Sequence, residues 1–231
     1  MWEGAQAALD ELREDDQTRL VVVSGSGGKA FVSGADISKF EKERSSPEDV
    51  AHYQQTSARF YQTLYNFPKP TLAAIRGYCI GGGMALAVCC DLRIAEEKSR
   101  FGVPAAKLGL GYGYDGIKRL ADLVGVSMAM EIFFTARQFS AGEAQDMGVV
   151  NRVLAEPVFD AFVDDYATRI CDNAPMTIAA VKMAARQITR DPADRDLDAL
   201  AQQVQACFDS EDYVEGRRAF MEKRKPRFQG R

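Results

Sequence analysis

The order in which strand-like and helical patterns follow one another constrains the fold of this chain more than any other feature. Residues 20–23 and 71–75 are short apolar runs, and 20–23 is rich in β-branched side chains, which is typical of buried strands. Further strands are predicted at 30–32, 92–95 and 100–103, and helices between the strands at 5–12, 48–67 and 84–91. From about residue 116 onward the pattern is almost wholly helical, over 116–124, 127–135, 140–147, 156–172, 175–190 and 196–221. Strands that alternate with helices, followed without a linker by a helical part, predict a single α/β domain over residues 1–231.

Composition excludes several classes of protein. Of the 231 residues, 46% are hydrophobic and 27% charged, as in soluble globular proteins. The net charge of −4, with both signs mixed along the chain, argues against a nucleic-acid partner, which requires a basic face. Five cysteines without metal-type spacing, and no signal-peptide pattern, indicate a reducing compartment. No stretch reaches the roughly 18 apolar residues of a membrane span. We therefore expect a cytoplasmic protein with no membrane, nucleic-acid or metal partner.

Two glycine-centred segments carry the chemical information in the sequence. In the first, over 29–37, a strand ends at Ser33-Gly34-Ala35, where small residues let a ligand approach the backbone closely. In the second, over 77–86, Gly81-Gly82-Gly83 comes directly before a helix, whose first N–H groups carry partial positive charge. No Lys-Ser/Thr pair follows these glycines, so the segment is not a phosphate loop. Each segment by itself is also typical of a tight strand–helix crossing.

Together, and in this order, the two segments resemble the crotonase superfamily, the enoyl-CoA hydratase/isomerase group. The resemblance covers nearly the whole chain and continues through Phe67-Pro68-Lys69-Pro70, Cys90-Asp91-Leu92-Arg93-Ile94-Ala95, Phe101-Gly102-Val103-Pro104, Leu108-Gly109-Leu110, Phe134-Thr135-Ala136-Arg137, 144–151 and 220–228. It implies an α/β fold, a spiral of ββα units over about 1–170, with C-terminal helices over about 171–231 that assemble homotrimers or hexamers. It also implies an acyl-CoA substrate, which itself carries coenzyme A, and no prosthetic group.

The resemblance further implies where the substrate binds. The backbone N–H groups of Ala35 and Gly82 would form an oxyanion hole for the thioester oxygen. When a bond at the carbon next to a thioester breaks, negative charge builds on that oxygen, and fixed N–H donors lower the barrier. Residues that would contact coenzyme A lie in the same two segments: Ser33, Asp36 and Ile37, through their backbone near the adenine, and Gly81 beside the helix.

The sequence departs from the family at two catalytic positions. Hydratases of the family carry glutamates where this chain has Ala85 and Ala105. Because hydration needs a base for water and an acid for carbon, the usual two-glutamate route is absent. Segments 108–117 and 209–213 resemble the methylmalonyl-CoA decarboxylases of the superfamily, which share the tyrosine at Tyr112 but carry a histidine at the position of Ala35. Decarboxylation requires no base, because loss of CO₂ itself leaves the enolate.

The remaining polar candidates each have two readings. Tyr112 would orient a leaving carboxylate, or it would merely line the pocket, as would Tyr114. Asp115 would be the single acid–base group of an isomerase, or the N-cap of a helix that begins near Gly116. The only histidine, His52, lies among polar residues of a helix and is expected at the surface.

Three functions therefore remain open. The first is an acyl-CoA lyase that forms an enolate, by decarboxylation of malonyl-type thioesters or by hydration of enoyl-CoA. The second is an enoyl-CoA isomerase that uses Asp115. The third is a non-catalytic scaffold that binds CoA esters. The family normally has a strand hairpin before the first helix, so either the reading frame starts upstream or the sheet lacks an edge.

Overall fold

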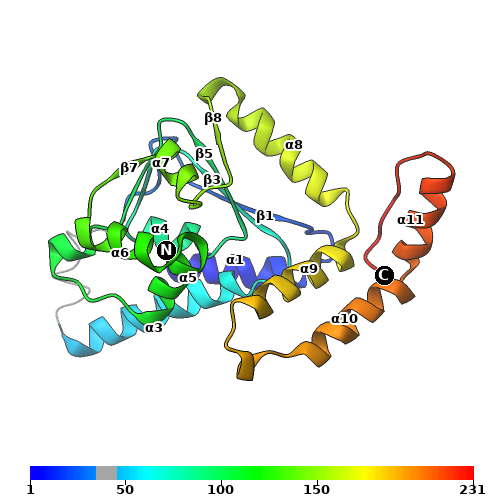
Figure 1. Cartoon of the computed structure of the whole chain (residues 1–231), viewed down its shortest axis with the longest axis horizontal. Helices are drawn as coiled ribbons and strands as arrows, with labels where there is room; N and C mark the ends of the chain where they lie inside the picture. The colour runs from blue at the N-terminus through cyan, green and yellow to red at the C-terminus, as the bar shows by residue number, and fades with distance from the viewer. Residues whose placement is uncertain (35–45) are drawn as a thin grey trace.

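The strands form two sheets of four within the part of the chain that the computed structural model describes, residues 1–34 and 46–231 (Figure 1). The first sheet is parallel and has the order β1 (Val21–Ser24), β3 (Thr71–Ile75), β5 (Leu92–Glu96), β8 (Arg152–Leu154). The second has the order β2 (Ala30–Val32), β4 (Tyr78–Ile80), β6 (Arg100–Gly102), β7 (Phe139–Ser140), and only β7 runs antiparallel to its neighbour. Three successive pairs of strands, β1 with β2, β3 with β4 and β5 with β6, each send the first strand to the first sheet and the second strand to the second sheet, and this confirms the predicted spiral of ββα units.

The predicted strands agree closely with the observed ones where they are buried. Those at 30–32 and 71–75 have the predicted bounds, and the first strand lies one residue later than predicted. All five residues of β3 are buried because both of its faces are covered. Ala73 and Ile75 face the main core, whereas Leu72 and Ala74 pack with Phe159 in a second cluster. The strands β4, β7 and β8 were not predicted, because two or three residues are too few to show a period.

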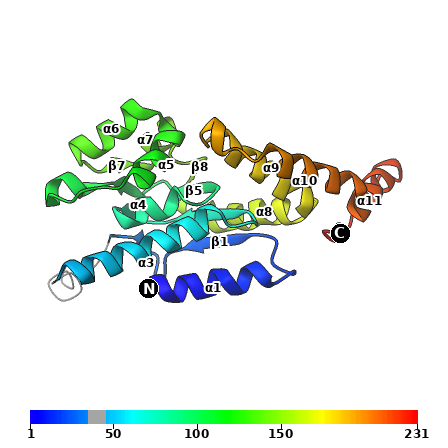
Figure 2. The same ribbon diagram turned by 90° about the horizontal axis from the view of Figure 1, so that it is seen from below.

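Helices cover the two sheets and then continue beyond them. Figure 2 shows α1 (Trp2–Glu14) alongside α3 (Pro47–Tyr65) on one side of the core. Ser46 begins α3 as predicted, since its hydroxyl accepts a hydrogen bond from the Asp49 N–H at 3.1 Å. The later helices are α4 (Gly82–Ala87), α5 (Tyr114–Val124), α6 (Val126–Thr135), α7 (Ala141–Asp146), α8 (Phe159–Cys171), α9 (Pro175–Ile188), α10 (Leu197–Asp209) and α11 (Glu211–Met221). Short 3₁₀ helices lie at Pro104–Leu108, Glu156–Val158 and Pro192–Asp194.

The single long helix predicted over 196–221 is wrong, because the helix breaks at Ser210. This residue has an extended backbone, with φ −78° and ψ 153°, and it ends α10. Its hydroxyl oxygen accepts a hydrogen bond from the Tyr213 N–H at 3.1 Å and so caps α11. The apolar period continues across the break, which hid it from the sequence pattern.

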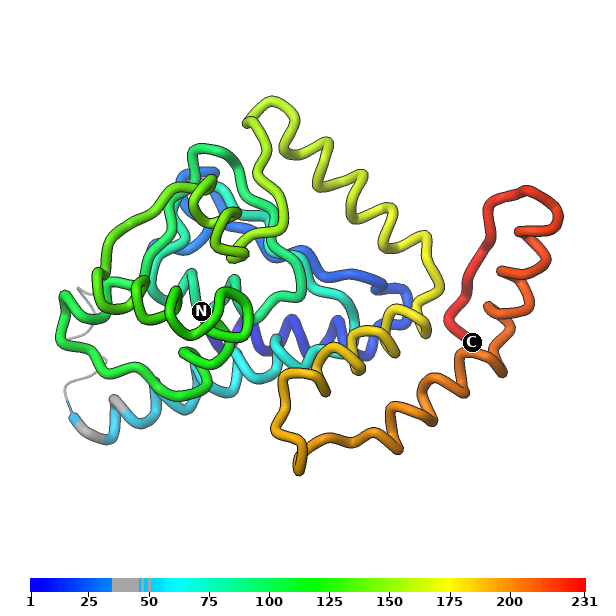
Figure 3. The backbone as a smooth tube through the Cα atoms, in the orientation of Figure 1, coloured from blue at the N-terminus to red at the C-terminus, as the bar shows by residue number. Residues whose placement is uncertain are grey.

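The C-terminal helices extend to one side of the core (Figures 1 and 3). In Figure 3 the last residues of the chain turn back along α11. The carboxylate of Asp212 holds this tail, since it accepts hydrogen bonds from the backbone N–H groups of Gln229 at 2.6 Å and Gly230 at 2.8 Å. No described helix is both long and apolar enough to cross a lipid bilayer.

Candidate active site

Three consecutive glycines join β4 to α4, and the geometry restricts two of them. Gly81 has a φ of 56°, which L side chains rarely adopt, and its N–H donates to the carbonyl of Gly102 at 2.8 Å. A Cβ on Gly83 would lie 2.1 Å from the carbonyl oxygen of Val32 in β2, so only glycine fits there. The first turn of α4 therefore packs directly against the end of β2.

Gly82 is the first residue of α4, and its N–H has no acceptor within the helix. The helix ladder starts later, where the Ala85 N–H donates to the Gly81 carbonyl at 3.0 Å. The segment after β2 lies close by: Gly34 has a φ of 110°, and a Cβ on Gly81 would be 4.0 Å from its Cα. The two glycine segments thus lie close together. This proximity is required if one N–H group from each segment is to bind the same oxygen atom.

The other residues predicted for this junction divide into two groups. Ser33 is exposed immediately before Gly34, so it lies at the meeting point of β2 and α4. Ala35, Asp36 and Ile37 lie outside the described residues. The second oxyanion donor and the predicted coenzyme A contacts of these three residues stay predictions.

Two alanines stand at the positions where the resemblance predicts glutamates. Ala85 follows Gly82 by three residues, so both are on one face of α4, and its side chain is half-buried. Ala105 is buried in the 3₁₀ helix Pro104–Leu108. Neither side chain can transfer a proton, so neither position supplies the expected carboxylate.

Tyr112 is a half-buried side chain in the segment before α5. Its ring lies edge-on to Phe133, with centroids 4.8 Å apart, and a Cβ on Gly116 would be 2.7 Å from the ring. Burial, with a smaller contribution from Cys89, raises the pKa of the Tyr112 hydroxyl to about 12. The hydroxyl is therefore protonated near neutral pH, which suits a hydrogen-bond donor and not a base.

Asp115 is exposed, and it does not cap a helix. The N-cap of α5 is Gly113, with no side-chain cap, and the helix begins at Tyr114, earlier than predicted. Asp115 lies within the first turn, where its charge complements the helix dipole. The expectation of an N-cap is wrong because Gly113, not Asp115, is the last residue with extended backbone. Tyr114 is 72% exposed, and His52 is exposed as expected.

Tyr61 was not predicted, yet its hydroxyl lies at the glycine junction. The hydroxyl donates a hydrogen bond to the carbonyl of Gly82 at 3.2 Å, and a Cβ on Gly82 would be 3.4 Å from the same oxygen. Burial first, then Tyr112 and Cys89, raises its pKa above the ordinary range. In the sequence Tyr61 and Tyr65 simply read as an apolar helix face, so no local pattern marked Tyr61 as a site residue.

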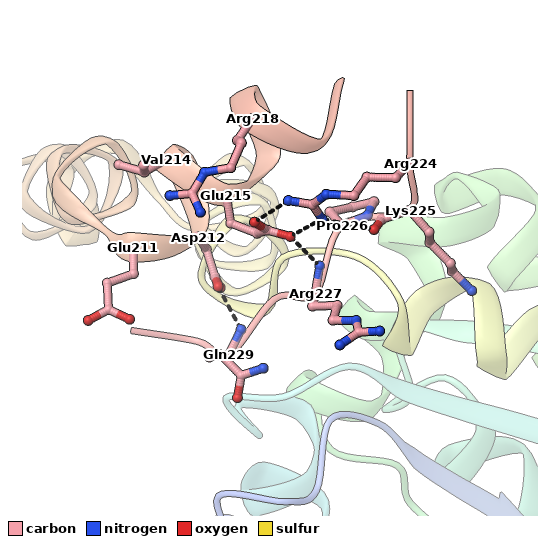
Figure 4. Close-up of a pocket in the computed structure, with 10 residues that line it drawn as sticks. All are labelled: Glu211, Asp212, Val214, Glu215, Arg218, Arg224, Lys225, Pro226, Arg227 and Gln229. Atoms are coloured by element: carbon pink, nitrogen blue, oxygen red, sulfur yellow. Dashed lines mark hydrogen bonds and ion pairs between the residues drawn. The ribbon is translucent and has the colours of Figure 1, made fainter. Parts of the chain in front are cut away.

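Other polar clusters in the described residues offer no competing centre. No group of His, Cys, Asp and Glu among them could hold a metal ion. A hollow of about 930 Å³ lies between α11 and the C-terminal tail (Figure 4). The Glu215 carboxylate lines this hollow. It forms an ion pair with the Arg224 guanidinium at 2.6 Å and accepts a hydrogen bond from the backbone N–H of Arg227 at 2.9 Å. These contacts fasten the tail to α11.

A spiral of ββα units that starts a helix on a glycine triplet is the architecture of the crotonase superfamily. The chain belongs to the enoyl-CoA hydratase/isomerase family, whose model matches residues 1–231.

Individual relatives support the same assignment. The chain is 35% identical over 221 residues to a crotonyl-CoA hydratase from Syntrophomonas wolfei, covering 96% of this chain and 84% of that protein. It is 35% identical over 217 residues to a short-chain-enoyl-CoA hydratase from Clostridium acetobutylicum, covering 94% and 82%. The solved structure of an enoyl-CoA hydratase/carnithine racemase from Magnetospirillum magneticum has a TM-score of 0.95 and 34% identity, covering 100% of this chain and 86% of that one.

Proposed function

We propose that this protein is an acyl-CoA lyase that stabilises a thioester enolate at the start of α4, and that its substrates are malonyl-type thioesters. The observation that carries the proposal is the N–H of Gly82, which has no acceptor within its own helix and lies next to Gly34, on a helix face where Ala85 stands in place of the expected carboxylate. Such a site can stabilise developing negative charge, and Ala85 supplies no base to it. Decarboxylation is the reaction of this chemistry that needs none.

In this reaction the bond between the α-carbon and the carboxylate breaks, and its electron pair becomes the enolate. The enolate oxygen accepts hydrogen bonds from the N–H groups of Gly82 and Ala35, aided by the dipole of α4. CO₂ leaves, and a proton from water returns to the α-carbon. Tyr112, protonated at neutral pH, would hold the carboxylate before it leaves. The backbone at Ser33 and Gly81, with Asp36 and Ile37, would hold coenzyme A.

Hydration of enoyl-CoA is the second candidate, because two relatives at 35% identity are named as hydratases. It would use the same oxyanion hole, but proton transfer would have to pass through ordered water, since tyrosines with raised pKa values are poor bases. An isomerase that uses Asp115 is less favoured by the geometry, because this carboxylate is exposed on α5.

Incubation with a panel of CoA esters separates these reactions. Purified protein is mixed with methylmalonyl-, malonyl-, crotonyl- and 3-enoyl-CoA, and products are followed by liquid chromatography and mass spectrometry. Decarboxylation shows as loss of CO₂, hydration as gain of water, and isomerisation as a change of retention time at constant mass. Loss of CO₂ from the first two esters is expected. Binding of every ester without any product would indicate the scaffold.

Two substitutions at Gly82 test the oxyanion role directly. Gly82→Pro removes the N–H at the first helical position, which proline tolerates, and should abolish turnover. Gly82→Ala is the matched control, because it keeps the N–H and places a Cβ 3.4 Å from the Tyr61 hydroxyl. Turnover by a folded Gly82→Pro variant at the rate of Gly82→Ala would refute the role, as would a bound thioester oxygen beyond about 3.5 Å from the Gly82 nitrogen.

We further propose that the protein assembles as a trimer or a hexamer through its C-terminal helices. An apolar hollow of about 870 Å³ lies among α9, α10 and α11. Phe208, Phe220 and Met221 line it and are 55%, 83% and 80% exposed. Large apolar side chains gathered in this way are typical of a surface that a second copy covers.

A further inference from the structure

The hydroxyl of Tyr61, in α3, contacts Gly82, the first residue of α4 and the proposed oxyanion donor. Its hydrogen bond to the Gly82 carbonyl measures 3.2 Å, and the space above the Gly82 Cα is limited by the same oxygen. Gly82, Ala85 and Tyr61 are all half-buried, so this face of the helix is partly open. The Tyr61 ring packs edge-on against the Trp2 ring, with the ring centroids 5.1 Å apart, and this contact holds it in place.

Three further polar groups lie near Tyr61. Tyr112 and Cys89 both contribute to the raised pKa of the Tyr61 hydroxyl, after the larger effect of burial. Arg119 of α5 donates from Nη1 to the Cys89 sulfur at 3.5 Å and from Nη2 to Gln62 Oε1 at 2.6 Å. No carboxylate among the described residues forms an ion pair with Arg119, so its charge is not neutralised there. The polar groups found near Tyr61 are thus the neutral Tyr112 hydroxyl and Cys89 thiol, with the Arg119 cation beyond Cys89.

We propose that Tyr61 is a catalytic residue whose hydroxyl contacts the anionic group on the carbon next to the thioester, and so selects carboxylated acyl-CoA esters over uncharged ones. This inference rests on the proposed function, and it assigns the selectivity for carboxylated substrates to Tyr61. The free enzyme keeps the Tyr61 proton on the Gly82 carbonyl. Rotation about the C–O bond turns the proton toward a carboxylate without moving the ring.

A neutral hydroxyl suits this task better than a cation would. The carboxylate loses its charge as CO₂ departs, so a strong ion pair to it would stabilise the substrate more than the transition state. A single hydrogen bond from a hydroxyl still fixes the direction of the breaking bond relative to the thioester plane. It stabilises the bound substrate less than an ion pair would. Arg119, held by Cys89 and Gln62, would contribute a favourable potential without pairing directly with the leaving group.

The test compares Tyr61→Phe with Tyr65→Phe, a matched change on the same helix. Tyr65 lies one turn further along α3, and its hydroxyl faces Thr189 at 3.3 Å. Binding is measured by calorimetry with sulfoacetyl-CoA, whose sulfonate replaces the labile carboxylate, and with acetyl-CoA, which lacks the anion. Tyr61→Phe should weaken sulfoacetyl-CoA binding about tenfold and leave acetyl-CoA binding unchanged, the usual effect of one hydrogen bond to a charged group. Tyr65→Phe should change neither value.

Turnover and thermal unfolding complete the experiment. For malonyl-CoA, Tyr61→Phe should lower kcat about tenfold, with a melting temperature close to that of Tyr65→Phe. If the two variants show the same sulfoacetyl-to-acetyl preference as the wild type, the inference is overturned. If the wild type releases no CO₂ from any ester but the preference still depends on Tyr61, the decarboxylase proposal fails and the assignment of Tyr61 as the anion contact stands.

Discussion

Single side chains near the start of α4 carry the proposed chemistry. Tyr61 donates a hydrogen bond to the Gly82 carbonyl, and Tyr112, from a different segment, contributes to the raised pKa of the Tyr61 hydroxyl. Asp115 lies only three residues after Tyr112 but faces solvent on α5. The polar side chain found at Gly82 is therefore a protonated hydroxyl, whereas Asp115 lies in solvent. The two neighbouring candidates, Tyr112 and Asp115, can be separated by mutation.

Tyr112→Phe should slow decarboxylation about tenfold, because it removes one hydrogen bond to the carboxylate while the ring keeps its contact with Phe133. Asp115→Asn should leave the rate unchanged. Steady-state rates with malonyl-CoA measure both effects. The reverse outcome, a loss of about 10²–10⁴-fold in Asp115→Asn with crotonyl- or 3-enoyl-CoA, would identify a general acid or base and contradict our assignment.

High pH should destabilise the fold through the same two tyrosines. Burial raises the pKa of Tyr112 to about 12 and that of Tyr61 in the same direction, whereas an unfolded tyrosine ionises near pH 10. The folded state binds these protons more tightly, so their contribution is complete below about pH 10 and is lost as the pH rises toward 12. The urea midpoint should be constant from pH 7 to 9 and lower at pH 11. Tyr112→Phe should show a smaller decrease, and an equal decrease would exclude Tyr112 as a cause.

At the scale of elements, an ionic cluster joins α9 to the strands. The carboxylate of Asp91 accepts from the Thr71 N–H at 2.8 Å, from Lys182 at 2.6 Å and from Arg186 at 2.8 Å. Arg186 also lies over the Tyr65 ring of α3, 3.7 Å from its centroid. The cluster therefore fixes where the C-terminal helices leave the core.

Asp91→Ala should lower the free energy of unfolding by about 3 kcal/mol, because it leaves two largely buried cations without their partner. Asp165→Ala is the matched control: its pair with Arg169 is exposed on α8, and its loss should cost less than about 0.5 kcal/mol. Urea denaturation of both variants gives the comparison. Equal stability of the two variants would show that the cluster does not anchor α9.

At the scale of the whole molecule, the spiral core and the extended helices bury their apolar side chains differently. The core cluster is closed, with Leu64, Phe67 and Phe101 fully buried. The hollow among α9, α10 and α11 instead leaves aromatic side chains exposed. Isolated in solution, such a surface costs free energy that association would recover.

Light scattering at micromolar concentration should therefore give a mass of three or six chains. Phe220→Asp should dissociate the assembly, because it would bury a charge in an apolar contact. Val158→Asp, at another exposed apolar position outside the hollow, should leave the mass unchanged. A monomeric mass for the wild type would rule out the proposed assembly.

The sequence by itself determined the features that depend on neighbouring residues. The buried strand at Thr71–Ile75, the cap at Ser46 and the glycine junction at Gly81–Gly83 all follow from local periodicity or backbone preference. The family assignment followed from the order of such motifs. Chain breaks that leave the apolar period intact, such as Ser210, could not be seen in this way.

Only the tertiary structure decided which side chains surround the junction. The hydroxyl of Tyr61 meets Gly82 across 21 residues because α3 packs beside the start of α4, and no sequence period encodes that contact. The same packing places Tyr112 inward and leaves Asp115 in solvent, although only three residues separate them. Local patterns fix the direction of a side chain relative to its own helix, whereas the neighbour it meets depends on how whole helices and sheets fill space together.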